Sequence, residues 1–321
     1  MNAPLPAVAD VSATTLWDLD DIVRDLRVAR ERWRLSQNRP LESGGREFPS
    51  RDALRDIVER LCGALFPMRL GPPDLLQGPS EDFYVGHTLD VALRGLLEQV
   101  RLELAHVARH DPLVDPTTID GDAIAVVRHF AAALPGIREL LDSDVEAAFR
   151  GDPAARSVDE IVLCYPGTLA IVHHRLAHTL YQLGVPLLAR MVSELAHSST
   201  GIDIHPGARI GHGFFIDHGT GVVIGETAVI GNRVRLYQAV TLGAKRFSVD
   251  ADGALEKGAP RHPIVEDDVV IYAGATILGR VTIGRGSSVG GNVWLTHSIP
   301  PGSFLTQAVS RNEALENGGG I

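Results

Sequence analysis

The fold is decided by residues 203–242, which read DIHPGARIGHGFFIDHGTGVVIGETAVIGNRVRLYQAVTL. Aliphatic side chains recur in this stretch at a period of six, with one alanine in a small slot. One column is Ile204, Ile210, Ile216, Val222, Ala228, Val234 and Val240. A second column, two residues later, is Ile224, Ile230, Leu236 and Leu242. After an interruption the period returns at Val265, Ile271, Ile277, Ile283, Val289 and Leu295.

A period of six is too short for a helical-repeat solenoid, and it matches one flat face of a left-handed parallel β-helix. In that fold each inward aliphatic side chain stacks on the one a coil below. Glycines follow many of these aliphatics, as corners with unusual backbone angles require. They include Gly211, Gly225, Gly231, Gly243, Gly279, Gly284 and Gly290. A run of ordinary β-hairpins would reach this register only by accident, so the sequence predicts a left-handed β-helix over residues 199–305.

Residues 15 to about 198 have a different character, with few glycines and apolar spacings of three and four. Proline and glycine breakers divide this segment into six to eight predicted helices. The predicted class is therefore α+β. A chain of 321 residues has room for two domains. We expect a helical domain over residues 1–198 whose first 14 or so residues are disordered, the β-helix over 199–305, and a flexible tail over 306–321.

Composition restricts the environment and the partners. The formal net charge is −10 and the sequence pI is about 5.7, so nucleic acid is not expected to bind. No apolar run approaches 18 residues and the N-terminus has no basic region, which predicts a cytoplasmic protein without a membrane span. The two cysteines, Cys62 and Cys164, offer neither metal-ligand spacing nor a disulfide framework.

Titratable side chains concentrate in the first coil, which holds three histidines and two aspartates within residues 203–218. Asp203 and His218 are fifteen residues apart, close to one turn of a coil, which can bring a carboxylate beside an imidazole. A carboxylate on one ring nitrogen fixes the tautomer and makes the other nitrogen a better base. His205 and His212 are expected to be structural.

The chain also resembles the serine O-acetyltransferases of the hexapeptide-repeat acyltransferase class. The resemblance is carried by DIHPGARIG at 203–211, IDHGTGVVIGETAVIG at 216–231, QAVTLG at 238–243 and RHP at 261–263. Upstream, RGDPA at 150–154 precedes a helical segment that ends in RLAH at 175–178, as in the family's helical domain. The resemblance to the family covers about residues 145–300.

The resemblance implies that an acetyl group passes from acetyl-CoA to the hydroxyl of L-serine, giving O-acetyl-L-serine and CoA, the first step of cysteine biosynthesis. His218 would be the general base, with Asp203 holding its imidazole, because an unassisted hydroxyl is a poor nucleophile at neutral pH. His262 would sit against the reacting centre and donate to the tetrahedral oxyanion.

Further motif positions imply substrate contacts. Arg261 would clamp the substrate carboxylate with its planar fork of donors, while Asp152 and Asp217 would accept hydrogen bonds from the ammonium. Asp152 also fits a plain turn residue before Pro153, and Glu226 would support its neighbours from behind. The pantetheine groove would be lined by backbone at Gly243, Ala244, Ala273 and Gly291. Acetyl-CoA is thus an expected co-substrate, with no permanently bound cofactor and no metal.

The family's assembly implies a homo-oligomer, either a trimer or a dimer of trimers, with active sites between neighbouring β-helices. The chain ends in NGGGI at 317–321, which resembles the family terminus that enters the active site of O-acetylserine sulfhydrylase. Binding of that enzyme through Ile321 is therefore a further expectation.

Three departures from the family pattern concern the donor site. The loop at 244–260 is longer than usual, and Lys245, Arg246 or Lys257 could reach a CoA phosphate. Tyr272 stands where a small residue is common, and SFLTQA at 303–308 replaces the usual tail motif.

Three alternatives remain open at this point. A zinc lyase of the carbonic anhydrase kind would use several histidines from neighbouring subunits, but it gives no reason for the RHP and DHGTG runs. A non-catalytic scaffold would not need the carboxylate–imidazole pair. Another hydroxyl or amine acceptor is the close competitor, because the fold alone does not choose an acceptor.

Overall fold

A computed structural model describes residues 19–37, 48–111, 113–245 and 258–307. The chain divides into two compact units, Met1–Glu47 and Phe48–Ile321. The first unit contributes helix α1 (Leu19–Ser36). The second holds α2 (Arg51–Leu65), α3 (Pro67–Leu70), α4 (Pro79–His110), the 3₁₀ turn η1 (Pro116–Thr118), α5 (Ile119–Gly151), α6 (Val158–Cys164), α7 (Pro166–Gln182) and α8 (Pro186–Thr200). The predicted helical region is confirmed.

The predicted breakers mark where these helices begin. Proline stands at the first position of α3, α4, α7 and α8, where its missing N–H has no helical partner to lose. Ser50 and Ser157 cap α2 and α6 by accepting hydrogen bonds from Ala53 and Glu160. Helix α8 ends at Gly201 in a left-handed conformation, and the β-helix begins two residues later. None of the described helices is both long and apolar enough to cross a membrane.

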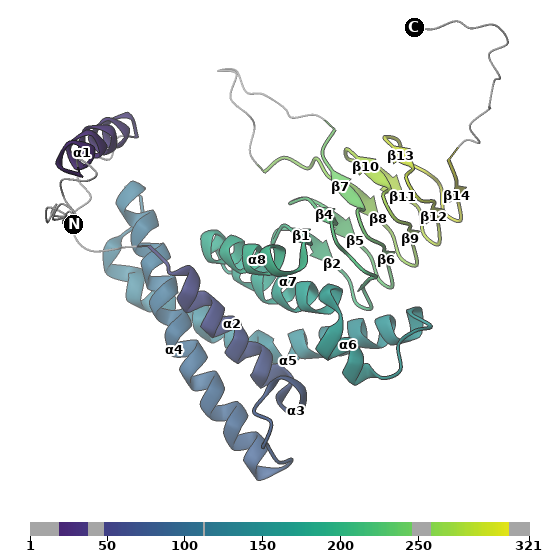
Figure 1. Ribbon diagram of the computed structural model, residues 1–321, viewed down its shortest axis with the longest axis horizontal. Coiled ribbons are helices and arrows are strands. Elements are labelled where there is room, and N and C mark those ends of the chain that lie inside the picture. Colours follow the sequence, from purple (N-terminus) through teal and green to yellow (C-terminus); the bar gives the residue numbers. More distant parts are fainter. Residues whose placement is uncertain (1–18, 38–47, 112, 246–257, 308–321) are drawn as a thin grey trace, which may run out of the picture. The chain divides into compact units, whose positions relative to one another are not determined.

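Parallel strands form three sheets, as the prediction of a β-helix requires. Sheet I contains β1 (Asp203–Ile204), β4 (Val223–Ile224), β7 (Thr241–Gly243), β10 (Thr276–Leu278) and β13 (Trp294–Leu295). Sheet II contains β2 (Arg209–Ile210), β5 (Val229–Ile230), β8 (Ile264–Val265) and β11 (Thr282–Ile283). Sheet III contains β3 (Phe215–Ile216), β6 (Arg235–Leu236), β9 (Val270–Ile271), β12 (Ser288–Val289) and β14 (Phe304–Leu305). Figure 1 shows the coils stacked from β1, beside α8, to β14.

The corner between sheets III and I changes length in the first coil. Six residues, 217–222, join β3 to β4, whereas four residues join the same sheets in later coils, at 237–240, 272–275 and 290–293. Asp203 therefore pairs with Val223, twenty residues on. For the same reason the first aliphatic column is not one structural column. It runs through strand positions as far as Ile216 and through corner positions from Val222 onward.

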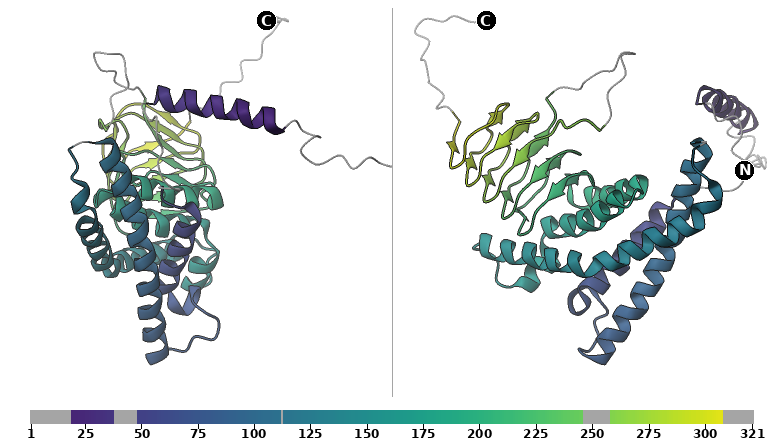
Figure 2. Two further views of the ribbon diagram at one scale, coloured as in Figure 1. Left: turned by 90° about the vertical axis from the view of Figure 1, so that its left-hand side faces the viewer. Right: turned by 180° about the vertical axis from the view of Figure 1, so that it is seen from behind.

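The β-helix rests on the helices through a buried ion pair. Helix α8 contacts β1, and α5 and α7 contact β3 (Figure 2). Arg175 of α7 binds both oxygens of Asp144 on α5 at 2.7 and 3.0 Å, and both side chains are 5% exposed. The same guanidinium donates to the carbonyls of Ile210 and Gly211, while Asp144 accepts from the backbone N–H of Phe214. Burial raises the pKa of Asp144, and the bonds from Arg175 oppose that rise.

We expect Arg175→Met to lower the free energy of unfolding by about 3–5 kcal/mol, because it leaves a buried carboxylate without its cation. The measurement is urea denaturation at fixed protein concentration. Arg94→Met is the matched control, since the ion pair of Arg94 with Asp90 on α4 is solvent-exposed and should matter little. Equal denaturation midpoints for the wild type and Arg175→Met would show that the ion pair of Arg175 with Asp144 does not hold the β-helix to the helices.

Candidate active site

Two groups of titratable side chains lie at two different corners of the β-helix. The first stands at the corner from sheet III to sheet I, next to the six-residue connection 217–222. The second stands at the corner from sheet I to sheet II, just after β4 and just before β8. Sheet I separates the two corners, so a single chain presents the predicted site residues as two halves.

His218 projects from the first corner. It has a positive φ of 60°, and its side chain is 71% exposed. The connection that carries it is two residues longer than the corners that join the same sheets in later coils. The nearest recorded carboxylate is Asp217, whose Oδ1 lies 3.8 Å from His218 Nε2. An accessible imidazole beside a carboxylate is suited to take a proton from a small ligand.

Asp152 and Asp217 both belong to this first corner. Asp152 caps α5, and its Oδ1 accepts a hydrogen bond from the Ala154 N–H at 2.8 Å. Its Oδ2 accepts from the Tyr165 hydroxyl at 2.5 Å. The hydroxyl bond, followed by the Ala154 bond, lowers the pKa of Asp152, so this group stays ionised. Asp152 is thus a turn residue and a member of the cluster at once.

Arg235 joins the two carboxylate-bearing segments. Its Nη2 donates to Asp217 Oδ2 at 2.5 Å, and its Nη1 donates to the Gly151 carbonyl at 2.6 Å. The side chain of Asp217 is 10% exposed. The first group therefore combines an exposed imidazole, two carboxylates and one guanidinium.

At the second corner Arg261 pairs with Glu226. Nη2 of Arg261 lies 2.6 Å from Glu226 Oε2, and the Tyr181 hydroxyl donates to Glu226 Oε1 at 3.0 Å. Partial burial by itself would raise the pKa of Glu226. The hydrogen bonds from Arg261 and Tyr181 outweigh this effect, so the pKa is lowered. Glu226 thus holds the Arg261 side chain in place, and its supporting role in catalysis stays a prediction.

His262 is held in one tautomer by its neighbours. Its Nδ1 accepts from the backbone N–H of Thr227 at 3.0 Å and lies 2.9 Å from the Thr227 hydroxyl. Burial, followed by the positive charge of Arg261, lowers the pKa of His262 to about 4. The ring is therefore neutral at neutral pH, and because Nδ1 is an acceptor its proton must lie on Nε2. A Cβ at Gly225 would come within 2.1 Å of that Nε2, so a larger residue at 225 would displace the His262 ring.

The residues of the predicted pantetheine groove also divide between the corners. Ala273 and Gly291 lie at the first corner in successive coils, where a Cβ on Gly291 would meet the Ala273 carbonyl at 3.1 Å. Gly243 ends β7 and Ala244 follows it at the second corner. Tyr272 stacks on Tyr237 with ring centroids 5.2 Å apart, beside Ala273. Lys245 is described, but Arg246 and Lys257 lie outside the described residues.

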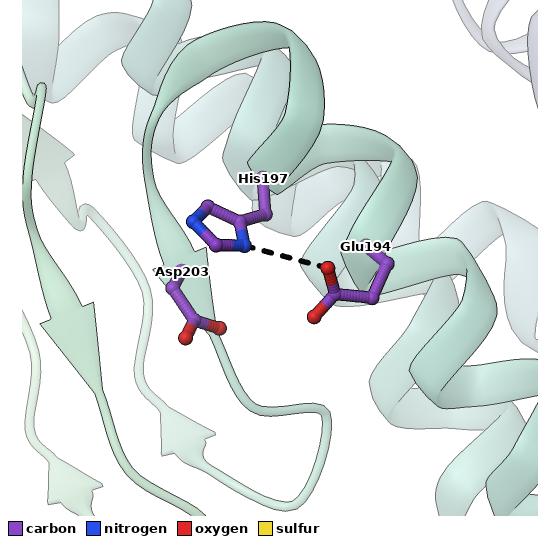
Figure 3. A group of neighbouring side chains, drawn as sticks. All are labelled: Glu194, His197 and Asp203. Atoms are coloured by element: carbon purple, nitrogen blue, oxygen red, sulfur yellow. Dashed lines mark hydrogen bonds and ion pairs between the residues drawn. The ribbon is translucent and has the colours of Figure 1, made fainter.

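Asp203 has other neighbours than the one predicted. Its carboxylate, Glu194 and His197 of α8 have ligand atoms within 4.8 Å of one another, and Figure 3 shows the three side chains turned toward one another. Glu194 already binds Arg190 at 3.0 Å. These three partly exposed side chains could contact a cation, but the structure gives no further sign of one. The pairing of Asp203 with His218 stays a prediction.

Sequence reasoning missed four residues of these groups: Tyr165, Arg235, Tyr181 and Thr227. Arg235 occupies the outward position of a strand, where a charged residue needs no explanation. Tyr165 and Tyr181 come from the helical region, and only the folded chain brings them to the corners. Thr227 follows Glu226 in the quoted motif and could have been singled out as a side-chain hydrogen-bonding residue.

Known proteins resemble the chain over most of its length. A family model described as bacterial transferase hexapeptide (six repeats) matches residues 262–297. A plasmid-encoded serine acetyltransferase of Synechococcus elongatus is 59% identical over 276 residues, 85% of this chain and 86% of the relative. A serine acetyltransferase of Bacillus licheniformis is 49% identical over 180 residues, 56% of this chain and 79% of the relative.

Solved structures agree with these relatives. Serine acetyltransferase isoform 3 of Entamoeba histolytica, in complex with cysteine, has a TM-score of 0.66 at 36% identity and covers 80% of this chain and 82% of that one. The Neisseria gonorrhoeae enzyme in complex with serine has a TM-score of 0.51 at 27% identity, over 80% and 95% of the two chains. The coiled fold, the two polar corners and an identity of 59% across most of both chains together show that this chain belongs to the serine acetyltransferase family.

Proposed function

We propose that the protein transfers the acetyl group of acetyl-CoA to the hydroxyl of L-serine, giving O-acetyl-L-serine and CoA. The observation that carries this proposal is the first corner, where an exposed imidazole stands beside two carboxylates that suit an amino-acid ammonium. Family membership supports acetyl transfer over a zinc lyase or a scaffold. The reaction would supply cysteine synthesis in the cytoplasm.

His218 is the general base of the proposed reaction. As the serine oxygen attacks the thioester carbonyl carbon, the hydroxyl proton moves to the imidazole. The tetrahedral intermediate then loses CoA by cleavage of the C–S bond, and the imidazolium returns the proton to the leaving thiolate. The base starts and ends neutral, so no further reactant is needed. In this proposal Asp203 orients the imidazole.

The charged groups orient serine for that attack. Asp152 and Asp217 accept hydrogen bonds from the ammonium, and Arg261 binds the carboxylate. A guanidinium carries five N–H donors, so its described bonds to Glu226 and to the Ala259 carbonyl leave donors for a ligand carboxylate. Holding both ends of serine places its hydroxyl in one position, which lowers the entropic part of the barrier.

His262 stabilises the negative charge that develops on the thioester oxygen. The tautomer set by Thr227 places its proton on Nε2, so this N–H can donate a hydrogen bond to the oxyanion. A preorganised donor of this kind contributes more to the transition state than to the ground state.

The two half-sites meet in this proposal between neighbouring subunits. One subunit supplies the first corner, with His218, Asp217, Ala273 and Gly291. Its neighbour supplies the second, with Arg261, His262, Glu226, Gly243 and Ala244. A cyclic trimer, alone or doubled, would bring unlike corners together three times. The partnership with O-acetylserine sulfhydrylase through Ile321 lies outside the described residues and stays a prediction.

The first test is release of the CoA thiol from acetyl-CoA with a panel of amino acids and sugars. We expect release that depends on L-serine, with formation of O-acetyl-L-serine measured by mass spectrometry, because the ammonium and carboxylate use both corners and the hydroxyl supplies the oxygen that is acetylated. Faster turnover with a sugar or an amine would overturn the proposed acceptor.

The second test concerns the base. His218→Ala should lower kcat at least about a hundredfold, the usual scale for losing a general base, while acetyl-CoA still binds. Asp203→Asn should give a smaller loss because it alters only orientation. His212→Ala is the matched control, since His212 is an exposed histidine at another corner of the same coil and should leave kcat unchanged. Near-normal turnover of His218→Ala would contradict the assignment.

The third test mixes inactive subunits. His218→Ala and Arg261→Ala damage opposite half-sites, so randomly mixed trimers should regain about a quarter of the wild-type sites. His218→Ala mixed with Asp217→Ala is the control, because both changes lie at the same corner and no intact site can form. Absence of regained activity in the first mixture, with mixed trimers verified by two affinity tags, would rule out shared sites.

A further inference from the structure

We propose that Arg235 is a positioning residue that holds the two carboxylates of the serine ammonium site in register. The inference rests on the proposed function of Asp152 and Asp217, and it adds a residue to which the sequence motifs gave no role. The residue lies on β6, directly across from Phe215 of β3 in the coil below.

The side chain of Arg235 follows a fixed path across the corner. Its guanidinium carbon lies 5.0 Å from the ring centre of Phe215 and 4.6 Å from that of Tyr237. The two rings restrict the planar group and reduce the rotamer freedom that it would otherwise lose on binding. The head group is therefore directed to the first corner by packing before any ligand arrives.

One guanidinium then connects two segments that are far apart in sequence. Nη1 binds the carbonyl of Gly151, the residue before Asp152, while Nη2 binds Asp217 Oδ2. These two bonds fix the distance between the end of α5, which carries Asp152, and the corner that carries Asp217. Gly151 also has little room, because a Cβ there would lie 3.0 Å from the Phe215 ring.

The bond to Asp217 also selects which oxygen a ligand can use. Oδ2 is engaged by Arg235, whereas Oδ1 faces the His218 side, 3.8 Å from Nε2. An ammonium bound to Oδ1 would therefore lie beside the base. A carboxylate free to rotate would bind the same ammonium in several positions, most of which leave the serine hydroxyl away from His218.

Charge balance leads to the same role. The two aspartates carry a formal charge of −2, and Arg235 reduces it to −1, which matches one ammonium. Without the guanidinium, two like charges would face each other across the site with no fixed separation, and the site would take up other cations more readily. Arg235 thus acts on both binding geometry and selectivity.

The competing explanation is that Arg235 only stabilises the fold. A structural residue would affect serine and acetyl-CoA alike and would lower thermal stability. A positioning residue would affect serine selectively. Arg235→Met keeps the apolar stem against Phe215 and Tyr237 and removes both hydrogen bonds. Arg235→Lys keeps the charge but can reach only one of the two acceptors well.

We expect Arg235→Met to raise the KM for serine at least about tenfold, with a smaller fall in kcat and an unchanged KM for acetyl-CoA. Arg235→Lys should fall between that variant and the wild type. Arg233→Met is the matched control: Arg233 lies two residues away, pairs with the exposed Asp268, and should leave both constants unchanged.

An unchanged KM for serine in both Arg235 variants overturns the inference, as does an equal rise in the KM of both substrates. If Arg235→Met fails to fold, Arg235→Lys decides: a raised KM for serine with an unchanged KM for acetyl-CoA supports the role, and a wild-type KM for serine overturns it. Failure of the proposed function is distinguishable, because the wild type itself would then release no thiol with serine.

Discussion

Backbone pairing between successive coils is the constraint on which the rest of the molecule depends. Each inner strand of the β-helix pairs with the coil on either side, so its position is set by its neighbours. Freedom remains at the corners, where the chain can lengthen without breaking a ladder. His218 lies at such a lengthened corner, 217–222, and Arg261 and His262 lie at the end of the long 244–263 connection. The paired strands thus make the coils rigid, and the irregular corners carry the polar side chains of the candidate site.

The sequence predicted the regular part well for a physical reason. Inward positions of a narrow β-helix accept only small or aliphatic side chains, and the period of six records this packing directly. Helix boundaries were also visible, because proline at the first helical position and serine at the cap act locally. The first aliphatic column shows the limit of the pattern, since a two-residue insertion next to Ile216 moved it from strand positions to corner positions without breaking the period.

The sequence named candidate site residues, but it did not give their arrangement. Family motifs pointed to His218 and Arg261, yet the separation of these residues onto two corners follows from which sheet each strand joins. The spacing of Asp203 and His218 looked like one turn, but the first coil needs twenty residues to return to the same strand position. Contacts such as Tyr165 with Asp152, or Arg235 with Asp217, join segments whose approach depends on tertiary packing, so no local signal announces them.

The six-residue corner has a consequence for how this protein can change. His218 is held at a positive φ, which for a residue with a side chain costs on the order of 1–3 kcal/mol. Shortening this corner to four residues would not remove the strain, because the four-residue corners at 237–240 and 290–293 also hold a non-glycine residue at positive φ, Ala239 at 58° and Asn292 at 56°. Deleting the two extra residues would therefore make the coil uniform without relieving strain, and it would disturb the residue proposed as the general base. Stabilised descendants of this protein should accumulate their gains in other coils and leave this corner irregular.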